Sequence, residues 1–363
     1  MHLRLLDKYV LKELLYPFIF GVASFSSIFI ASSMLFKIVK YITTYGASTS
    51  SVAKLFIYSM PEIINYTFPM SVLLATLMAF GKLSGSSEIV AMKSGGISYY
   101  RMVAPVVIVG FIVSMFSVIW AEKVVPPSKH EAKRILEVEI KGDAKPKTQE
   151  HIVIKTLKGD TQRITYARTF NENTGIMRDV TIEEFNKRKL SRIQTAKTAR
   201  WEDNKWVLRN GVVFTMDEKE GIVNKADFKK QVIPINTTPR EISWEQKDVE
   251  EMTLGELRGY IKILERQKQS TAHCWTEIFM RFAIPLASLV FALVGAPLGT
   301  QRQRSGSSIG LGISVLVIFV YYAIMAFATG LGKGGVIPPF FGAMASNIIF
   351  FIAGICLLRK ADY

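Results

Sequence analysis

Residues 102–121 read MVAPVVIVGFIVSMFSVIWA, and none of these side chains carries a charge. A helix needs about 20 apolar residues to cross the hydrocarbon core of a bilayer, which is the length of this stretch. Similar uncharged stretches occur at 14–36, 63–81, 282–301, 305–332 and 334–358. The sequence therefore predicts six transmembrane helices.

Charged residues gather in one region, between the third and fourth predicted spans. Residues 122–275 hold 30 of the 45 Lys and Arg residues and 24 of the 30 Asp and Glu residues. This segregation excludes a single soluble domain, a disordered chain and a disulfide-rich secreted scaffold. The two cysteines, Cys274 and Cys356, lie near opposite membrane faces and are not expected to pair. We expect a membrane protein with one polar domain inserted into it.

Basic residues in the short loops predict the orientation of the chain. Ten of them lie on one side together with the N-terminus: Arg4, Lys8, Lys12, Lys82, Lys93, Arg101, Arg302, Arg304, Arg359 and Lys360. The opposite side holds four: Lys37, Lys40, Lys54 and Lys333. Short cytoplasmic loops carry the excess of Lys and Arg, whereas long domains cross regardless of charge. Both termini are therefore predicted to be cytoplasmic, with residues 122–275 on the outer side.

The polar domain alternates between apolar and polar residues with the period of a β-strand. Short runs of this kind occur at 151–156, 162–170, 177–185, 190–199 and 212–214, and Trp201 to Trp206 reads as a hairpin tip. This spacing is typical of an antiparallel sandwich or open barrel, predicted here for residues 122–252. Thr253 and Glu256 then fit a capping box at the start of an amphipathic helix in 253–275. The predicted order is spans one to three in 1–121, this β domain, the connecting helix, and spans four to six in 276–363.

The sequence holds no pattern that predicts catalysis. It lacks the G-x-x-x-x-G-K-[ST] string of a phosphate-binding loop, and its four histidines are scattered. We therefore expect no catalytic residue, no metal site and no ATP hydrolysis of this kind.

Positive charge lies where the membrane makes it costly. Lys37 and Lys40 follow the first span, and Lys129, Lys133 and Arg134 follow the third on the same side. Such side chains either extend toward lipid headgroups or recognise an anionic group at the outer leaflet. The carboxylate of Glu62 is placed to balance this cluster.

A short helix is predicted in the loop between the second and third spans. Ser86 or Ser87 supplies the N-cap, Glu88 lies in the first turn, and Gly95-Gly96 ends the helix. Such a helix is either a simple connector or an element that a cytosolic motor subunit binds.

Several strings, taken in order, match a known family. They are residues 6–9 (LDKY), 68–70 (FPM), 83–96 (LSGSSEIVAMKSGG), 120–127 (WAEKVVPP), 295–298 (GAPL) and 337–342 (IPPFFG). Placed around a β domain between spans three and four, they give a chain that resembles the LptF/LptG permease family of the lipopolysaccharide export system and leans toward its LptG branch.

The resemblance implies an α-helical inner-membrane protein of Gram-negative bacteria, with six transmembrane helices and an inserted periplasmic all-β domain like a jellyroll. It implies that the chain extracts lipopolysaccharide from the outer leaflet and passes it to a periplasmic bridge protein. A second permease subunit pairs with it, and two copies of a cytosolic ATP-binding subunit use the ATP, so this chain itself binds no cofactor.

The resemblance also assigns residues. The family's coupling helix corresponds to 84–96, with Ser87, Glu88, Ile89 and Met92 toward the ATP-binding subunit. Residues that contact lipopolysaccharide correspond to Lys37 and Lys40 after the first span and to Lys129, Lys133 and Arg134 after the third.

Three alternatives remain at this point. A permease with the same coupling could move a lipoprotein or another lipid. A scaffold that anchors a β domain in the inner membrane would need no coupling helix. A membrane enzyme would need pairs of His, Asp or Glu within its spans, and none is present.

Overall fold

The computed structural model describes residues 5–141, 148–158, 161–171, 174–186, 189–217, 221–233, 238–245, 248–300 and 307–362. The chain divides into two compact units. The helical unit comprises Met1–Asp143 and Ala272–Tyr363, and the β unit comprises Ala144–Thr271. Arg4, Arg302 and Arg304, three of the residues behind the predicted orientation, lie outside the described residues.

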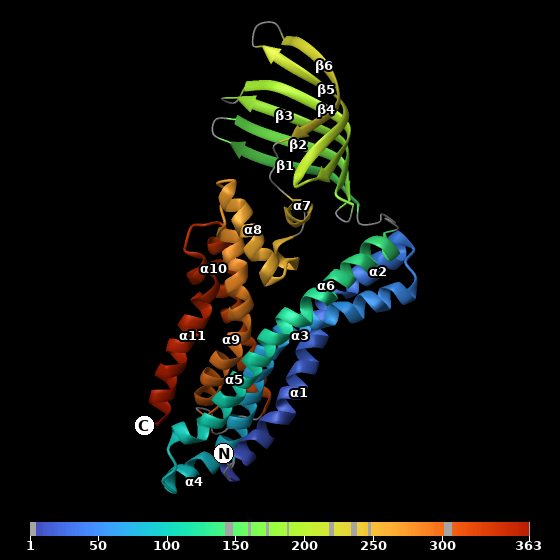
Figure 1. Ribbon diagram of the computed structural model, residues 1–363. Helices are drawn as coiled ribbons and strands as arrows, with labels where there is room; N and C mark the ends of the chain where they lie inside the picture. Colours follow the sequence, from blue (N-terminus) through green and yellow to red (C-terminus); the bar gives the residue numbers. More distant parts are fainter. Residues whose placement is uncertain are drawn as a thin grey trace. The chain divides into compact units, whose positions relative to one another are not determined.

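The helical unit is built from long apolar helices (Figure 1). They are α1 (Leu5–Ser33), α2 (Leu35–Tyr45), α3 (Thr49–Gly85), α4 (Glu88–Ser94), α5 (Tyr99–Lys123), α6 (Val125–Arg134), a π-helical turn (Ile135–Ile140), α9 (Ala272–Thr300), α10 (Ser307–Lys333) and α11 (Pro339–Asp362). Within the described residues, six helical segments are long and apolar enough to cross a membrane. The prediction of six membrane helices is confirmed.

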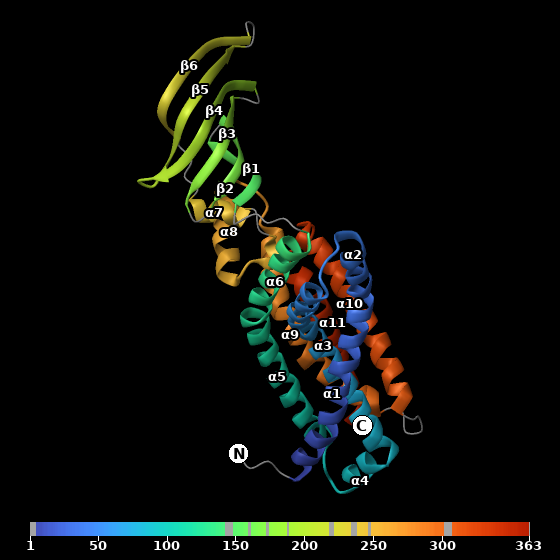
Figure 2. The ribbon, with the colours of Figure 1, turned by 90° about the vertical axis from the view of Figure 1, so that its right-hand side faces the viewer.

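Helix α4 marks one end of this unit, and α2 and α6 lie at the other (Figures 1 and 2). We call these the α4 end and the α2 end. Gly46 ends α2 with a left-handed φ of 62°, which residues with a Cβ rarely adopt. Ser48 then caps α3, because its side chain accepts a hydrogen bond from the backbone N–H of Ser51. The chain therefore reverses sharply between α2 and α3.

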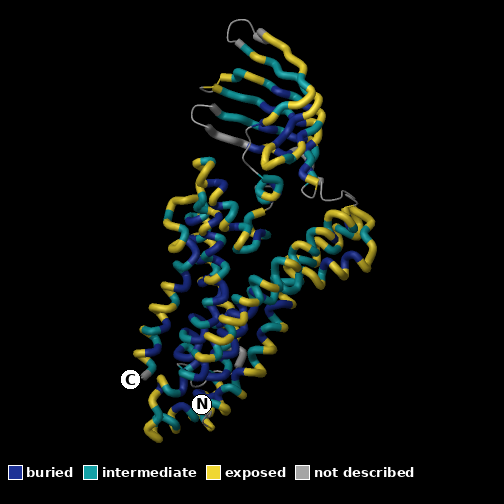
Figure 3. The backbone as a smooth tube through the Cα atoms, viewed as in Figure 1, coloured by how far each residue is buried: buried dark blue, intermediate teal, exposed yellow. Residues whose placement is uncertain are grey.

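Helices α3 and α9 form the centre of the helical unit. In their most apolar windows, 78% of the α3 residues and 61% of the α9 residues are buried, against 17% for α1–α2 and 22% for α10. Figure 3 shows the same contrast between buried central helices and exposed outer ones. Glycines allow the close approach, since a Cβ on Gly299 would lie 2.9 Å from the carbonyl oxygen of Leu77. The outer helices thus expose apolar side chains on the surface of the unit.

Residues 122–140 are helical, so the expected β domain does not begin at residue 122. Pro126 and Pro127 occupy the first turn of α6, where the missing proline N–H costs nothing. Ile135 and Ile140 are buried against Val52 and Leu55 of α3. This packing holds the segment in the helical unit, and the first strand of the described residues begins at Thr148.

The β unit contains a single sheet of six described strands. They are β1 (Thr148–Lys158), β2 (Thr161–Asn171), β3 (Ile176–Asn186), β4 (Lys189–Glu202), β5 (Lys205–Asp217) and β6 (Gly221–Ile233). Each strand pairs antiparallel with the next, in the order β1-β2-β3-β4-β5-β6 (Figure 1). The predicted antiparallel strands are confirmed, although β6 was not predicted. The described strands share one sheet instead of the two sheets of a sandwich.

Alternation places one apolar face of the sheet in a core. Ile152, Ala167 and Val180 are register partners on β1 to β3, and all three are buried. The helix α7 (Pro239–Glu245) adds Ile242 to this buried cluster. A 3₁₀ turn (Val249–Glu251) and the helix α8 (Leu254–Arg266) follow. Helix α8 begins with the expected capping box of Thr253 and Glu256.

The predicted hairpin tip lies between β4 and β5. Trp201 and Trp206 are register partners, and Glu202 pairs with Lys205. The turn therefore has two residues, Asp203 and Asn204, both with positive φ. Asp and Asn favour a two-residue hairpin turn of this kind. It is shorter than the predicted turn of four polar residues.

Candidate functional site

Helix α4 projects at one end of the helical unit, between α3 and α5. Gly96 has a φ of 83°, the N–H of Gly96 bonds to the carbonyl of Lys93, and the N–H of Ile97 bonds to that of Met92. This pattern is a Schellman motif and confirms the glycine stop. Ser87 occupies the N-cap position, as predicted, but it has a left-handed φ of 63° and its side chain makes no cap hydrogen bond.

The carboxylate of Glu88 is held by two hydroxyl groups instead. Tyr9 of α1 donates to one oxygen at 2.7 Å, and Ser86 donates to the other at 2.8 Å. The hydrogen bond from Tyr9, followed by that from Ser86, lowers the pKa of Glu88 below its ordinary value. Glu88 is therefore ionised at neutral pH, and it lies partly exposed at the first turn of α4.

The four predicted coupling residues divide between two faces of α4. Ile89 is buried and Met92 packs against the same core cluster, so both point into the helical unit. Ser87, Val90, Ala91 and Ser94 are exposed. The outer face therefore consists of Val90, Ala91 and Ser94 beside Ser87 and Glu88, and three of these residues were not predicted.

Helix α4 is also bonded to the ends of distant helices. Lys93 donates to the backbone carbonyl of Ala361 in α11 at 2.6 Å, and its ammonium lies 5.5 Å from the centre of the Tyr99 ring. The hydroxyls of Tyr99 and Thr300 are 2.8 Å apart, which joins α5 to the end of α9. The two hydrogen bonds link residues 268 and 201 positions apart, and no local sequence signal indicates them.

The five predicted lipid-contacting cations all lie at the α2 end, but they differ in their partners. Lys129 forms an ion pair with Glu62 at 2.8 Å, as the predicted balancing role of Glu62 requires. Arg134 donates to Glu131 from Nε at 2.8 Å and lies 3.5 Å from Glu139. Lys133 is half-buried on the same helix. Opposite charge therefore offsets Lys129 and Arg134.

Lys37 and Lys40 are exposed, as is Arg134. Both lysines lie on α2, and neither makes an ion pair or hydrogen bond within the part of the chain that the structure describes. Ile38 and Tyr41 of the same helix pack against the cluster formed by Val52 and Ile135. This packing directs the two lysines away from the protein, where an anionic group can approach them.

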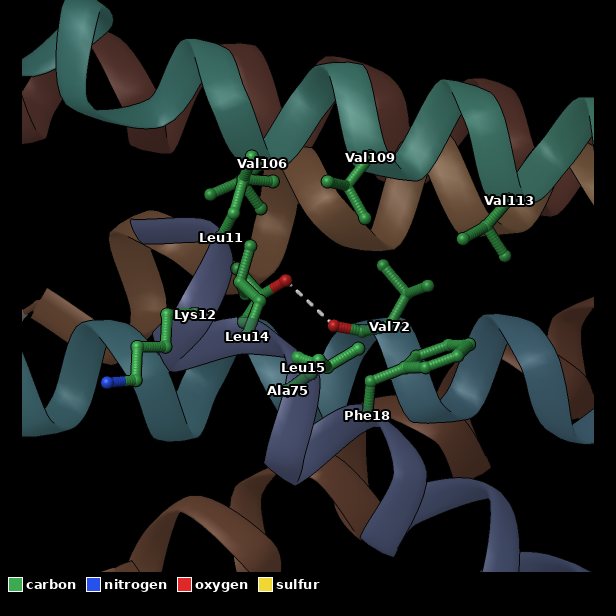
Figure 4. A pocket seen from close by; sticks show the side chains of 11 residues that line it. Leu11, Lys12, Leu14, Leu15, Phe18, Val72, Ala75, Val106, Val109 and Val113 are labelled. Atoms are coloured by element: carbon green, nitrogen blue, oxygen red, sulfur yellow. Dashed lines mark hydrogen bonds between the residues drawn. The ribbon is translucent and has the colours of Figure 1, made fainter. Parts of the chain in front are cut away.

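A cavity of about 460 Å³ lies between α1, α3 and α5 (Figure 4). Its lining includes Leu14 of α1, Val72 of α3 and Val106 of α5. Ten of the eleven lining residues carry no charge. The exception, Lys12, lies on α1 with its ammonium directed away from the cavity (Figure 4). The cavity has apolar walls of the kind that acyl chains contact.

Residues 8–360 match the family described as lipopolysaccharide export system permease LptF/LptG. The chain belongs to the LptF/LptG family. It is 24% identical over 328 residues to the lipopolysaccharide export system permease protein LptG of Escherichia coli (strain K12), with 83% of each chain covered. It is 23% identical over 373 residues to the LptG protein of Haemophilus influenzae, with 98% of this chain and 99% of that protein covered. The family predicted from short strings is confirmed, and these LptG relatives agree with the predicted branch.

Membership in the LptF/LptG family bears on how the two ends of the helical unit are interpreted. The family is one of transport permeases, in agreement with the prediction that the chain is not an enzyme. Among the described residues, no group of three or more His, Cys, Asp or Glu side chains could hold a metal ion. The features that stand out are therefore the α4 helix, the exposed lysines and the apolar surfaces.

Proposed function

We propose that this chain is a permease subunit of an exporter that extracts lipopolysaccharide from the outer leaflet of the inner membrane. The match to the LptF/LptG family over residues 8–360 carries this proposal, since it spans both units. The long coverage of the LptG relatives supports it. The orientation is the one that the short loops predict, with both termini and α4 in the cytoplasm and the β unit in the periplasm.

The exposed apolar helices suit a lipid substrate. Each buried CH₂ contributes about 0.8 kcal/mol, so moving one chain of a dozen carbons through water would cost roughly 10 kcal/mol. An export path must therefore offer apolar surface throughout. Phe20 of α1, Phe319 of α10 and Phe351 of α11 are 50%, 69% and 46% exposed. A second permease subunit, either a paralogue or another copy of this chain, would supply the rest of this apolar surface.

The α2 end suits the anionic part of the same lipid. In the proposed orientation, Lys37 and Lys40 lie at the outer leaflet, where the phosphates of lipopolysaccharide are found. Their charges are unpaired within the described residues, so they can bind phosphate without first breaking an ion pair. Lys129, Lys133 and Arg134 form a second row, in which Glu62, Glu131 and Glu139 moderate the positive charge.

The α4 end suits a cytosolic ATP-binding subunit, of which the exporter would contain two copies. Glu88 presents an ionised carboxylate beside the exposed face of Val90, Ala91 and Ser94. A groove with a basic residue would bind this helix by its acidic N-terminus and small apolar face. ATP would be used by that partner, with no cofactor in this chain.

The β unit suits transfer toward a periplasmic bridge protein. The sheet of described strands has an apolar face and two edge strands, β1 and β6. We propose that the unit acts as the jellyroll of the family, receives the lipid and extends the path by strand pairing with the bridge protein.

The first experiment is a mild-detergent purification of the tagged chain from native membranes, with ATP hydrolysis measured for wild type and Glu88→Lys. We expect an ATPase to co-purify with the wild type and to be lost or uncoupled in Glu88→Lys. Glu265→Lys is the matched control, because Glu265 is exposed on α8 of the other unit. A folded wild-type chain that brings no ATPase would overturn the proposal and favour a scaffold.

A further inference from the structure

Three polar contacts join the first turns of α1 to the α3–α4–α5 segment. Asp7 accepts two hydrogen bonds from Arg101 of α5, at 2.6 and 2.9 Å. Glu13 pairs with Lys82 of α3 at 2.7 Å. Between them, Tyr9 donates to Glu88 at 2.7 Å. The segment LDKY at residues 6–9 therefore supplies two of these contacts, and the proposed function so far uses neither.

These contacts matter because α1 is not adjacent to α4 in the chain, since α2 and α3 lie between them. Helices α3 and α5 flank α4 in the chain and must follow any movement of it. Helix α1 can follow only through packing and polar contacts. Its side chains Val10 and Leu14 are buried in the same cluster as Ile89 of α4, and beyond the cavity of about 460 Å³ α1 packs on α3, where Ser26 lies 3.3 Å from Thr67. The polar contacts near the α4 end add directional links to this packing.

Tyr9 is the one residue of the three that bonds to α4 itself. Tyr9 is 36% exposed, and its hydroxyl reaches the first residue of the helix. A carboxylate oxygen can accept more than one hydrogen bond, so Glu88 can hold Tyr9 and still accept a donor from outside. A hydrogen bond to a charged group is also stronger than a neutral one.

We propose that Tyr9 is a positioning residue, which orients the carboxylate of Glu88 and joins α1 to α4, so that a movement of α4 reaches the lipid-facing helix α1. The inference rests on the proposed function, because it takes α4 as the helix that the ATP-binding subunit moves. Loss of the Tyr9 hydroxyl leaves the docking face of α4 in place but disconnects α1. ATP is then hydrolysed with little transport.

The test uses the whole exporter, purified with its ATP-binding subunit and reconstituted into vesicles that contain lipopolysaccharide. Lipopolysaccharide extracted per ATP hydrolysed is measured for wild type and Tyr9→Phe, which removes one oxygen and keeps the ring. We expect the ATP-binding subunit to stay bound to Tyr9→Phe, and the extraction per ATP to fall by about fivefold or more, as for loss of a charge-assisted hydrogen bond. Size-exclusion chromatography checks that the variant is folded.

Two matched controls separate linkage from local orientation. Ser86→Ala removes a hydrogen bond of similar length to the same carboxylate, but one that comes from the end of α3 and not from α1. Tyr100→Phe removes a hydroxyl from an exposed tyrosine at the first turn of α5. We expect Tyr100→Phe to keep the wild-type extraction per ATP, and Ser86→Ala to lower it much less than Tyr9→Phe does, because neither disconnects α1.

A double variant tests whether Tyr9 acts through Glu88. Adding Tyr9→Phe to Glu88→Gln should lower extraction per ATP less than it does in the wild type, because the charge-assisted bond is already weakened. An equal fall in both backgrounds, an equal fall in Ser86→Ala, or an unchanged Tyr9→Phe would each overturn the inference and leave the proposed function standing. Absence of an ATP-binding subunit from the wild-type complex would overturn both.

Discussion

Lys37 and Lys40 differ from Lys129 and Arg134 in their surroundings, although all four are cations at the α2 end. Carboxylates lie within ion-pair distance of Lys129 and Arg134. The ammonium groups of Lys37 and Lys40 face outward without such a partner in the described chain. An anion that approaches this end therefore meets its strongest unbalanced attraction at α2.

This difference predicts which lysines bind the lipid. We expect Lys37→Gln/Lys40→Gln to raise the apparent Kd for lipopolysaccharide roughly 30-fold, since each cation near an anionic surface contributes about 1 kcal/mol. Binding of labelled lipopolysaccharide to the purified exporter, with low and high salt compared, measures the change.

The matched control removes the ion pair and keeps the net charge. Lys129→Gln/Glu62→Gln deletes one cation and one anion of similar size, so we expect little change in affinity. An equal loss of binding in both double variants would show that the unpaired lysines have no special role.

At the scale of the element, glycine decides how closely α9 approaches α3. Gly295 faces Thr76, and Gly299 faces Leu77 and Phe80. Gly295 begins the GAPL string of residues 295–298, and Gly299 directly follows it. The string is thus explained by packing, because a side chain at these positions would push the two central helices apart.

We therefore expect Gly299→Ala to destabilise the chain by about 1–3 kcal/mol, the usual cost of overpacking a core. Its Cβ would lie 2.9 Å from the Leu77 carbonyl oxygen. Thermal unfolding of the detergent-purified protein measures the change. Gly312→Ala on α10 is the control, because nothing lies within 4 Å of its Cβ and the substitution favours the helix. Equal melting temperatures for the two variants would contradict the packing argument.

At the scale of the whole molecule, the proposed export path requires α4 and the β unit on opposite sides of the membrane. The helical unit separates its α4 end from its α2 end, and the six membrane helices connect them. The chain leaves the α2 end after Ile140 to enter the β unit. The proposed orientation, with α4 in the cytoplasm, would therefore place the β unit in the periplasm.

Cysteine labelling tests this orientation. In a Cys274→Ser/Cys356→Ser background, Ser94→Cys on α4 and Asp227→Cys on β6 each provide one exposed thiol. We expect a membrane-impermeant maleimide to label Asp227→Cys in spheroplasts with an intact inner membrane, and Ser94→Cys only after permeabilisation. Labelling of Ser94→Cys before permeabilisation would reverse the assigned sides.

The sequence by itself determined the six membrane helices, most of the strands and the family. A bilayer requires about 20 apolar residues per helix, and strands alternate with period two, so both signals are local. It also placed a short helix with Glu88 in its first turn and a glycine stop, because Gly96 needs a positive φ.

The tertiary structure alone decided which side chains meet. Residues 122–140 belong to the helical unit because Ile135 and Ile140 are buried on α3, and this contact moves the boundary of the β domain from the predicted residue 122. Ile89 turned inward, while Lys129 acquired Glu62 of α3 as its carboxylate partner. Tyr9 and Glu88 are 79 positions apart, and their hydrogen bond exists only because packing brings α1 beside α4. Such pairings depend on the distances between helices, which no short stretch of sequence encodes.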